Sequence, residues 1–228
     1  MSLILHMDAA VTASVSIAKD GNLLQYAVNT TQKDHAAFLN NAITELLQSS
    51  GFTLASLDAI AVASGPGSYT GLRVAMASAK GLCYALQKPF ITIGTLPILA
   101  KAAIMHTTSG PDDLFCPMID ARRMEVYTAV YDRDLKEIMK PVPVILEENS
   151  FSTLLAKNKM YFFGDGATKF KPVQSHKNAY FITAKNEVEA FAKLAYERFI
   201  KNIFTDLVDS EPLYVKDFHS TPSSHNKK

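Results

Sequence analysis

The sequence predicts an α/β fold with two lobes built to one plan. Segments with the apolar pattern of strands alternate with segments of helical period along the chain. The order of three strands, a helix, a strand and a helix is predicted once in each half. Each half opens on an apolar strand that ends in an aspartate, LILHMD at residues 3–8 and FCPMID at residues 115–120. Because the halves share almost no residue identity, only the plan repeats.

The first half alternates predicted strands and helices. Its strands lie at residues 3–7, 13–18, 22–28, 58–63 and 90–93, and its helices at residues 34–49, 70–86 and 95–106. Asp20-Gly21, between the second and third strands, is typical of a hairpin turn. In the first helix, apolar residues recur at helical spacing from Phe38 to Leu47, and Gly51 ends the pattern.

The second half follows the same order. Its strands are predicted at residues 114–119, 125–131, 135–139 and 160–163, and its helices at residues 151–158 and 187–201. Asn149 caps the shorter helix, and the longer helix carries an apolar stripe from Val188 to Phe199. The polar, turn-rich segment HTTSGPDD at residues 106–113 is the predicted lobe boundary. We therefore expect one lobe at residues 1–106, a second at residues 107–218 and a disordered tail at residues 219–228.

The most informative segment is SGPGSYTGLRVAMASAKGLCYAL at residues 64–86. It opens with a glycine-rich turn after a buried strand, and the turn contains Gly65, Gly67, Ser68, Thr70 and Gly71. The helix that follows has no charges besides Arg73 and Lys80, so it is apolar on every side. The side that faces away from its own sheet must therefore be covered as well. Its small residues form two ridges at four-residue spacing, Gly71, Ala75 and Ala79 on one and Ala77, Gly81 and Ala85 on the other. Both another helix and the protein's own core could provide that cover.

The composition disfavours several classes of function. The net charge of +1 gives no basic field for nucleic acid, and no apolar run approaches the ~20 residues that span a bilayer. The N-terminal segment MSLILHMDAA lacks the basic start of a signal peptide. Cys83 and Cys116 stand far apart in apolar runs, as expected of buried thiols in a reducing compartment. The sequence has neither a CxxC pair nor a Cys/His cluster of the kind that zinc or redox sites use.

Four segments together resemble the TsaB family, also called YeaZ. They are SGPGSYTGLRVAMASAKGL at residues 64–82, DARRMEVYTAVYD at residues 120–132, FGDGA at residues 163–167 and EPLYVKDF at residues 211–218. The resemblance runs from Leu3 to about Phe218. It implies a duplicated ribonuclease-H-like, actin-like (ASKHA) fold, which agrees with the repeated order of elements. It also implies a bacterial cytoplasmic role in making N6-threonylcarbamoyladenosine (t6A) beside the anticodon of tRNA.

The resemblance also implies a set of partners. In that system the related subunit TsaD carries the active site, TsaB binds and activates TsaD, and TsaE joins as an ATPase. A chain of this kind is a non-catalytic subunit without a cofactor of its own, because ATP, ADP and the metal belong to the partner subunits. It meets tRNA only through the complex, has no membrane partner, and should form a homodimer when its partner is absent. The rival hypothesis is an actin-like ATP-binding enzyme that acts on its own.

Metal-dependent and hydrolytic chemistry are disfavoured. TsaD-like enzymes hold a metal with an HxxxH pair on their first long helix. In the matching segment DHAAFLNNAI, His35 stands alone and Leu39 occupies the second position. A single imidazole is a poor site for a divalent metal, so we expect no metal and no metal-dependent peptidase activity. Ser64 and Ser68 lie beside glycines, but the segment is not the G-x-S-x-G motif of a hydrolase.

Nucleotide binding is the stronger rival. In active actin-like ATPases the phosphates lie between the loops that follow the first strand of each lobe, where Asp8 and Asp120 stand here. Ala9 and Ala10 occupy positions at which active members usually offer hydroxyl groups. Arg122 and Arg123 in the second loop offer guanidinium groups to an anion, although a salt bridge or a solvated turn is the favoured interpretation of this pair. Asp8, Asp120 and Arg122 are therefore predicted to mark a vestigial nucleotide site.

The helices at residues 34–49 and 70–86 are the predicted docking surface for the TsaD-like partner. The first helix is expected to contribute His35, Phe38, Leu39, Ala42 and Ile43. The second helix is expected to contribute Arg73, Val74, Ala77, Ala79, Lys80 and Tyr84. Because the sheet also covers one side of each helix, the sequence alone leaves open which face meets the partner.

Overall fold

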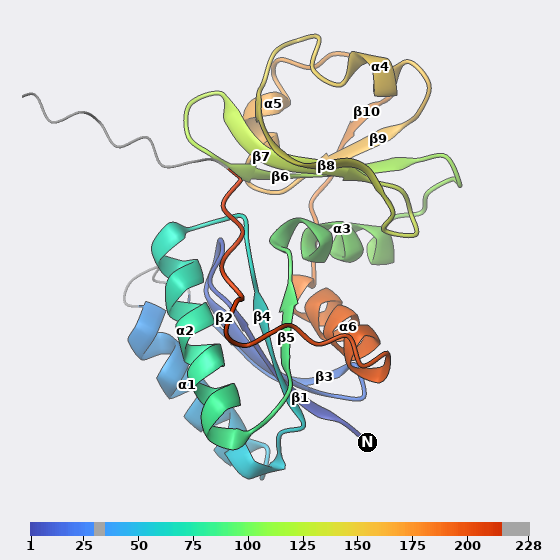
Figure 1. Cartoon of the computed structure of the whole chain (residues 1–228). Coiled ribbons are helices and arrows are strands. Elements are labelled where there is room, and N and C mark those ends of the chain that lie inside the picture. The colour runs from blue at the N-terminus through green and yellow to red at the C-terminus, as the bar shows by residue number, and fades with distance from the viewer. Residues whose placement is uncertain (30–34, 216–228) are drawn as a thin grey trace, which may run out of the picture.

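Two five-stranded sheets form the framework of the molecule (Figure 1). The computed structural model describes residues 1–29 and 35–215, so the tail predicted at residues 219–228 lies outside the described residues. The first sheet has the strand order β3-β2-β1-β4-β5, with β1 (Leu3–Asp8), β2 (Ser14–Lys19), β3 (Asn22–Val28), β4 (Ala59–Ala63) and β5 (Phe90–Ile93). The second has the order β10-β9-β6-β7-β8, with β6 (Leu114–Asp120), β7 (Glu125–Tyr131), β8 (Glu137–Ile145), β9 (Met160–Phe163) and β10 (Ala179–Phe181).

The two sheets pair their strands in the same way. β1 is antiparallel to β2 and parallel to β4, and β6 is likewise antiparallel to β7 and parallel to β9. The repeated plan predicted from the sequence is therefore confirmed. Because β1 and β4 run parallel, the loop after Asp8 and the turn after Ala63 emerge at the same edge of the first sheet.

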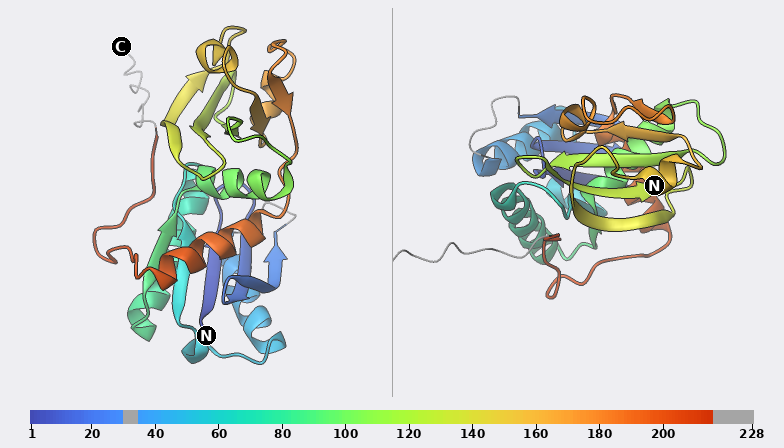
Figure 2. Two further views of the ribbon diagram at one scale, coloured as in Figure 1. Left: turned by 90° about the vertical axis from the view of Figure 1, so that its right-hand side faces the viewer. Right: turned by 90° about the horizontal axis from the view of Figure 1, so that it is seen from above.

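Helices cover both faces of the first sheet. α1 (His35–Ser49) and α2 (Tyr69–Leu86) pack side by side on one face, and α6 (Glu187–Ile200) packs on the other (Figures 1 and 2). α3 (Thr95–His106) lies between the two sheets, against α6 and β6. α6 follows the second sheet in the chain, yet its Phe191 lies in one core cluster with Ile4 and Ile93 of the first sheet. The chain therefore crosses back to the first sheet after the second one, which a division at residue 106 does not anticipate. None of the helices in the described part of the chain is long and apolar enough to cross a membrane.

Several short segments differ from the predicted elements. β8 spans Glu137–Ile145 and not residues 135–139, because Pro141 and Pro143 are tolerated in a strand at the edge of its sheet. The helix predicted at residues 151–158 is a single turn, α4 (Ser152–Leu155). β10, α5 (Ala167–Phe170) and the 3-10 turn η1 (Leu54–Ser56) are not predicted, because elements this short carry little periodicity.

After α6, which already packs on the first sheet, the chain continues along the first lobe as an irregular segment, residues 203–215, which we call the C-terminal strap (Figure 2). The Thr205 amide donates a hydrogen bond to the Phe90 carbonyl at 2.8 Å, beside the edge strand β5. The Leu213 amide donates to the Ser64 carbonyl at 2.7 Å, and a Cβ atom built at Gly65 would lie 2.8 Å from the Leu213 carbonyl oxygen. The strap therefore covers the β5 edge and ends against the glycine-rich turn.

Candidate functional site

The glycine-rich turn holds the start of α2 against the loop that follows β1. A Cβ atom built at Gly67 or Gly71 would collide with the carbonyl oxygen of Ala10 or Ala9, respectively. The Ser68 amide donates to the Ala10 carbonyl at 2.6 Å, and Ser68 Oγ accepts from the Gly71 amide at 3.3 Å, which caps α2. Close packing between the turn and this loop therefore accounts for both glycines.

Asp8 and Asp120 form the same turn in the two lobes. Oδ1 of Asp8 accepts a hydrogen bond from the Ala10 amide at 2.7 Å, and Oδ1 of Asp120 accepts one from the Arg122 amide at 2.5 Å. Burial raises the pKa of Asp8 to about 6. Lys169, whose Nζ lies 2.9 Å from Oδ1 of Asp120, instead lowers the pKa of that carboxyl group. The two turns share a geometry and differ in their electrostatics.

A cleft of about 300 Å³ opens beside Asp8. The charged residues that line it are all acids, Asp8, Asp165 and Glu187, and neither Asp120 nor Arg122 is among its lining residues. Burial raises the pKa of Glu187, and the charge of Asp165 adds to this rise. Polyphosphates are held by cations and N–H donors, so the carboxylates of this cleft repel the ligand that a nucleotide site would hold.

No cluster of metal-ligating side chains lies in the described part of the chain. Within residues 1–29 and 35–215, the structure places no group of three or more His, Cys, Asp and Glu side chains where they could hold an ion. His35 begins α1, but its side chain lies outside what the structure describes, and Leu39 is fully buried. His6 is buried with its ring against Phe191, and burial lowers the pKa of His6 to about 4.

The two small-residue ridges of α2 point to opposite sides of the helix. Ala79 is 0% exposed and faces the sheet, together with Gly71, Leu72, Ala75, Met76 and Cys83. Ala77, Gly81 and Ala85 are exposed, as is Thr70 in the first turn. Tyr84, on the exposed side, is 73% exposed. The first ridge therefore belongs to the core, and the second belongs to the surface.

Helix α1 turns its predicted contact residues toward the core. Leu39, Ala42 and Ile43 are buried in the same cluster as Ala79, and Phe38 packs half-buried against this cluster. The protein's own core accounts for the three buried side chains and for the buried part of Phe38, so less of α1 is available to a partner than the sequence predicts. Among the residues of α2 that are exposed or half-buried, five form a stripe of small and apolar side chains that we call the α2 face, Val74, Ala77, Gly81, Tyr84 and Ala85.

The C-terminal strap engages both charged residues of α2. Nε of Arg73 donates to Oη of Tyr214 at 3.0 Å, and the guanidinium carbon lies 4.1 Å from the centre of the Tyr69 ring. Nζ of Lys80 donates to the carbonyls of Val208 and Ser210, both at 3.1 Å. Arg73 and Lys80, which the sequence predicts as partner contacts, therefore hold the protein's own chain beside the α2 face. No local pattern could reveal contacts between residues 128 to 141 positions apart.

The chain is similar to several known proteins. A family model described as TsaD, tRNA N6-adenosine threonylcarbamoyltransferase, matches residues 28–223. The tRNA threonylcarbamoyladenosine biosynthesis protein TsaB of Escherichia coli K12 is 33% identical over 132 residues, which are 58% of this chain and 55% of the relative. TsaB of Bacillus subtilis 168 is 33% identical over 120 residues, which are 53% of this chain and 50% of the relative. The matches thus span about half the length of these curated relatives.

A solved structure is similar over nearly the whole chain. It is a Pseudomonas aeruginosa protein described as similar to the peptidase YEAZ, with a TM-score of 0.81 and 25% identity. The superposition covers 95% of this chain and 100% of that one. Together with the repeated strand order, this similarity establishes the duplicated actin-like α/β fold.

Proposed function

Because the chain belongs to the TsaD family of tRNA N6-adenosine threonylcarbamoyltransferases, in which it groups with the TsaB (YeaZ) proteins, we propose that it is a non-catalytic partner subunit. It binds and activates a TsaD-like enzyme in forming t6A next to the anticodon of tRNA. The observation that carries this proposal is the α2 face, a stripe of small and apolar residues of which Ala77, Gly81, Tyr84 and Ala85 are exposed and Val74 is half-buried.

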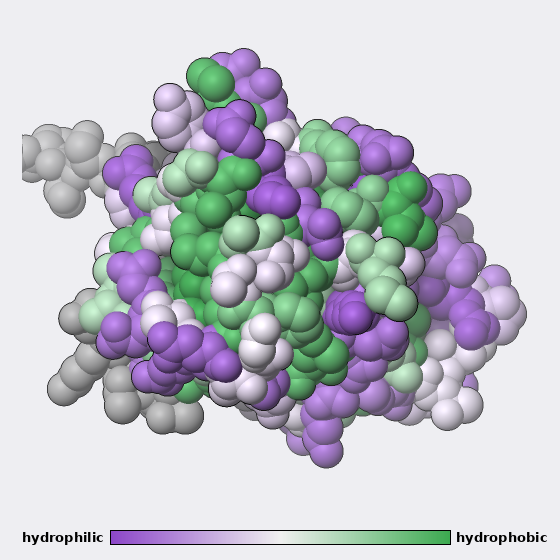
Figure 3. Space-filling model, turned by 90° about the horizontal axis from the view of Figure 1, so that it is seen from below, coloured by the Kyte–Doolittle hydropathy of each residue, from purple (hydrophilic) through white to green (hydrophobic). Residues whose placement is uncertain are grey.

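The α2 face has the shape that a second helix needs. Small residues at Ala77, Gly81 and Ala85 allow another helix to approach to the usual separation of about 8–10 Å between axes. A Cβ atom built at Gly81 would meet nothing within 4 Å, so this position is open. Tyr84 adds a large exposed ring of the kind that anchors protein interfaces. The lower end of the same lobe also exposes apolar surface, in a band flanked by polar residues (Figure 3).

The acid-lined cleft supports the non-catalytic part of the proposal, because its carboxylates repel phosphates. In this account ATP or ADP and the metal belong to the partner subunits, and a TsaE-like ATPase joins the complex. The protein meets tRNA only through the complex, in the cytoplasm. In the absence of the partner, the α2 faces of two copies pair with each other in a homodimer.

Reconstitution tests the proposal. The chain, a TsaD-like paralogue and a TsaE-like ATPase are purified separately, and t6A in tRNA is measured after each is incubated, alone and in combination, with tRNA, ATP and a threonylcarbamoyl donor. We expect no t6A from the chain alone, and a higher yield from the paralogue when the chain is added. Formation of t6A by the chain alone, or an unchanged yield on adding it, contradicts the proposal.

A further inference from the structure

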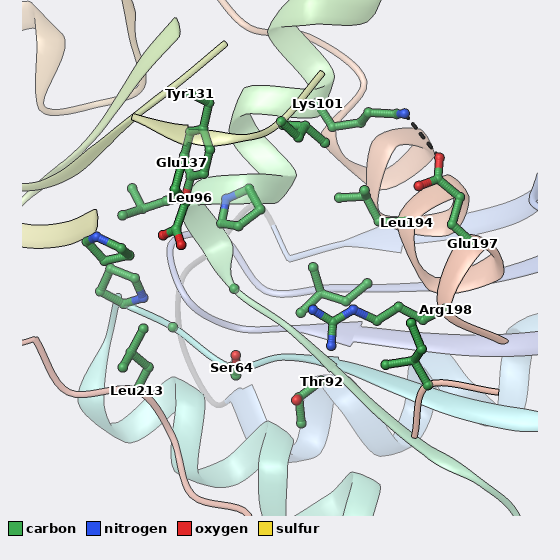
Figure 4. Close-up of a pocket in the computed structure, with 18 of the residues that line it drawn as sticks. Ser64, Thr92, Leu96, Lys101, Tyr131, Glu137, Leu194, Glu197, Arg198 and Leu213 are labelled. Atoms are coloured by element: carbon green, nitrogen blue, oxygen red, sulfur yellow. Dashed lines mark hydrogen bonds and ion pairs between the residues drawn. The ribbon is translucent and has the colours of Figure 1, made fainter. Parts of the chain in front are cut away.

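A second and larger cleft, of about 720 Å³, lies on the β5 side of the first lobe (Figure 4). Its walls come from the glycine-rich turn, α3, the turn between β7 and β8, the C-terminal half of α6 and the strap. It shares no lining residue with the acid-lined cleft, which is bounded by the N-terminal half of α6. Its volume is within the range of about 300–1,000 Å³ that is typical of small-molecule sites.

Cationic side chains without an ion-pair partner line this cleft. Within the described ranges, Arg133 after β7 and Arg198 and Lys201 at the end of α6 form no salt bridge. Figure 4 shows Arg198 reaching from α6 toward the middle of the cleft, above Thr92 and Ser64. Lys101, by contrast, is paired with Glu197 at 3.1 Å. A guanidinium group that projects into a cleft in this way is suited to binding a carboxylate or phosphate.

A buried hydroxyl group of the same cleft has no hydrogen-bond partner. Tyr131 is 2% exposed, and its Oη is unpaired in the structure. Burial and the nearby Glu137 raise the pKa of Tyr131, so the phenol keeps its proton and remains a donor. An unpaired buried donor is unfavourable, but the hydroxyl oxygen of Tyr131 exposes almost no surface, so a ligand in the cleft does not reach it in this structure.

The apolar and acidic residues that line the rest of the cleft restrict the size and charge of the ligand that fits it. Leu96, Leu135 and Leu194 give the cleft apolar walls, which suit an organic body. Asp134 and Glu137 carry negative charge near the β7–β8 turn, so they oppose a second anionic group there. We propose that this cleft binds a small organic anion with one acidic group, a phosphate monoester or a carboxylate, which pairs with Arg198.

Titration calorimetry tests this site with phenyl phosphate and benzoate as probes and benzyl alcohol as the neutral control. We expect saturable binding of at least one anion and none of benzyl alcohol at concentrations up to about 10 mM. The anion that binds more tightly distinguishes phosphate from carboxylate recognition. Arg198→Gln should weaken binding at least about tenfold, whereas Tyr131→Phe removes a hydroxyl group that the ligand does not reach and should leave the affinity unchanged. Lys193→Gln is the matched control, because Lys193 lies on the same helix, pairs with Glu189 at 3.4 Å and does not line the cleft.

Thermal melts of the same variants confirm that each one is folded. Tyr131→Phe should melt at or above the wild-type temperature, because it removes an unpaired buried hydroxyl group. Ala77→Arg, which changes the α2 face, should leave anion binding unchanged, so the two surfaces are tested separately. The proposal is overturned if neither anion binds saturably, or if Arg198→Gln binds the anion as tightly as the wild type does.

Discussion

Ala77 and Ala79 stand two positions apart on α2 and point to opposite sides of it. Ala79 is fully buried against the first sheet, whereas Ala77 is exposed. Two residues turn a helix by about 200°, so a single helix can serve the core with one side and a partner with the other. The apolar character of α2 on all sides therefore has two separate causes, packing within the lobe and the α2 face.

Two glycines of α2 provide a matched test of this division. Gly71→Ala would drive a Cβ atom into the Ala9 carbonyl, so we expect a loss of about 1–3 kcal/mol in the free energy of unfolding. Gly81→Ala meets nothing within 4 Å and should stabilise the helix by up to about 1 kcal/mol. Urea unfolding of both variants measures the two changes. Equal effects at the two positions would show that α2 has no open side.

The pH dependence of stability should contain two opposing contributions. The pKa of His6 is about 4 in the folded chain and 6.5 for the free group, so the unfolded state binds the extra proton and stability falls as pH falls through this window. The pKa of Asp8 is about 6 in the folded chain and 3.8 for the free group. The folded state therefore binds the extra proton, and stability rises as pH falls from 6 to 3.8. Each shift corresponds to roughly 3 kcal/mol, so the two nearly cancel.

Single substitutions should expose each contribution. Relative to the wild type, His6→Gln should gain stability as the pH is lowered from 7 to 4.5, and Asp8→Asn should lose it. Denaturant unfolding at several pH values gives the slopes, and only differences in slope are compared, so a general destabilisation does not matter. Parallel curves for the three proteins would contradict the assigned protonation of both groups.

The sequence predicted the parts of this fold that depend on local pattern. The strand that ends in Asp8, the glycine-rich turn and α2 are each encoded by residues close in the chain, and all are present in the structure. The crossing of α6 to the first sheet was not predicted, because an amphipathic stripe does not specify which sheet it covers. The contact between Arg73 and Tyr214 was not predicted either, since the two residues are 141 positions apart.

Which side of α2 is exposed could not be predicted from the sequence either. Ala77 and Ala79 have the same side chain in equally apolar surroundings, so only the packing of the helix on the sheet distinguishes them. Leu39 illustrates the same point in α1, because a leucine at helical spacing suits a partner and a core equally well.

Binding of ATP tests the rival function. With only carboxylates as the charged lining of the cleft beside Asp8, we expect the isolated chain to bind ATP–magnesium weakly or not at all. Calorimetry on the purified chain measures this directly. Micromolar binding that Asp8→Ala abolishes would favour the actin-like ATP-binding enzyme. Replacing Asp165 by Asn removes one negative charge and should, if anything, improve the weak binding.

The C-terminal strap should loosen when Lys80 loses its ammonium group. Lys80→Met keeps most of the apolar stem and removes the donors to the Val208 and Ser210 carbonyls. We expect faster amide hydrogen exchange in the strap, with a change of no more than about 1 kcal/mol in global stability. Lys193→Met on α6 serves as the control. Unchanged exchange in the strap would show that these hydrogen bonds do not hold it.

The most direct test of the account is calorimetric titration of Ala77→Arg and Ala79→Arg against the purified TsaD-like partner, with a thermal melt of each variant. Ala79→Arg should fail to fold, because it buries a charge in the core. Ala77→Arg should melt near the wild-type temperature, yet lose at least about a hundredfold in affinity, because the complex would bury an unpaired charge. A folded Ala77→Arg chain that binds the partner with wild-type affinity would contradict the α2 face as the docking surface.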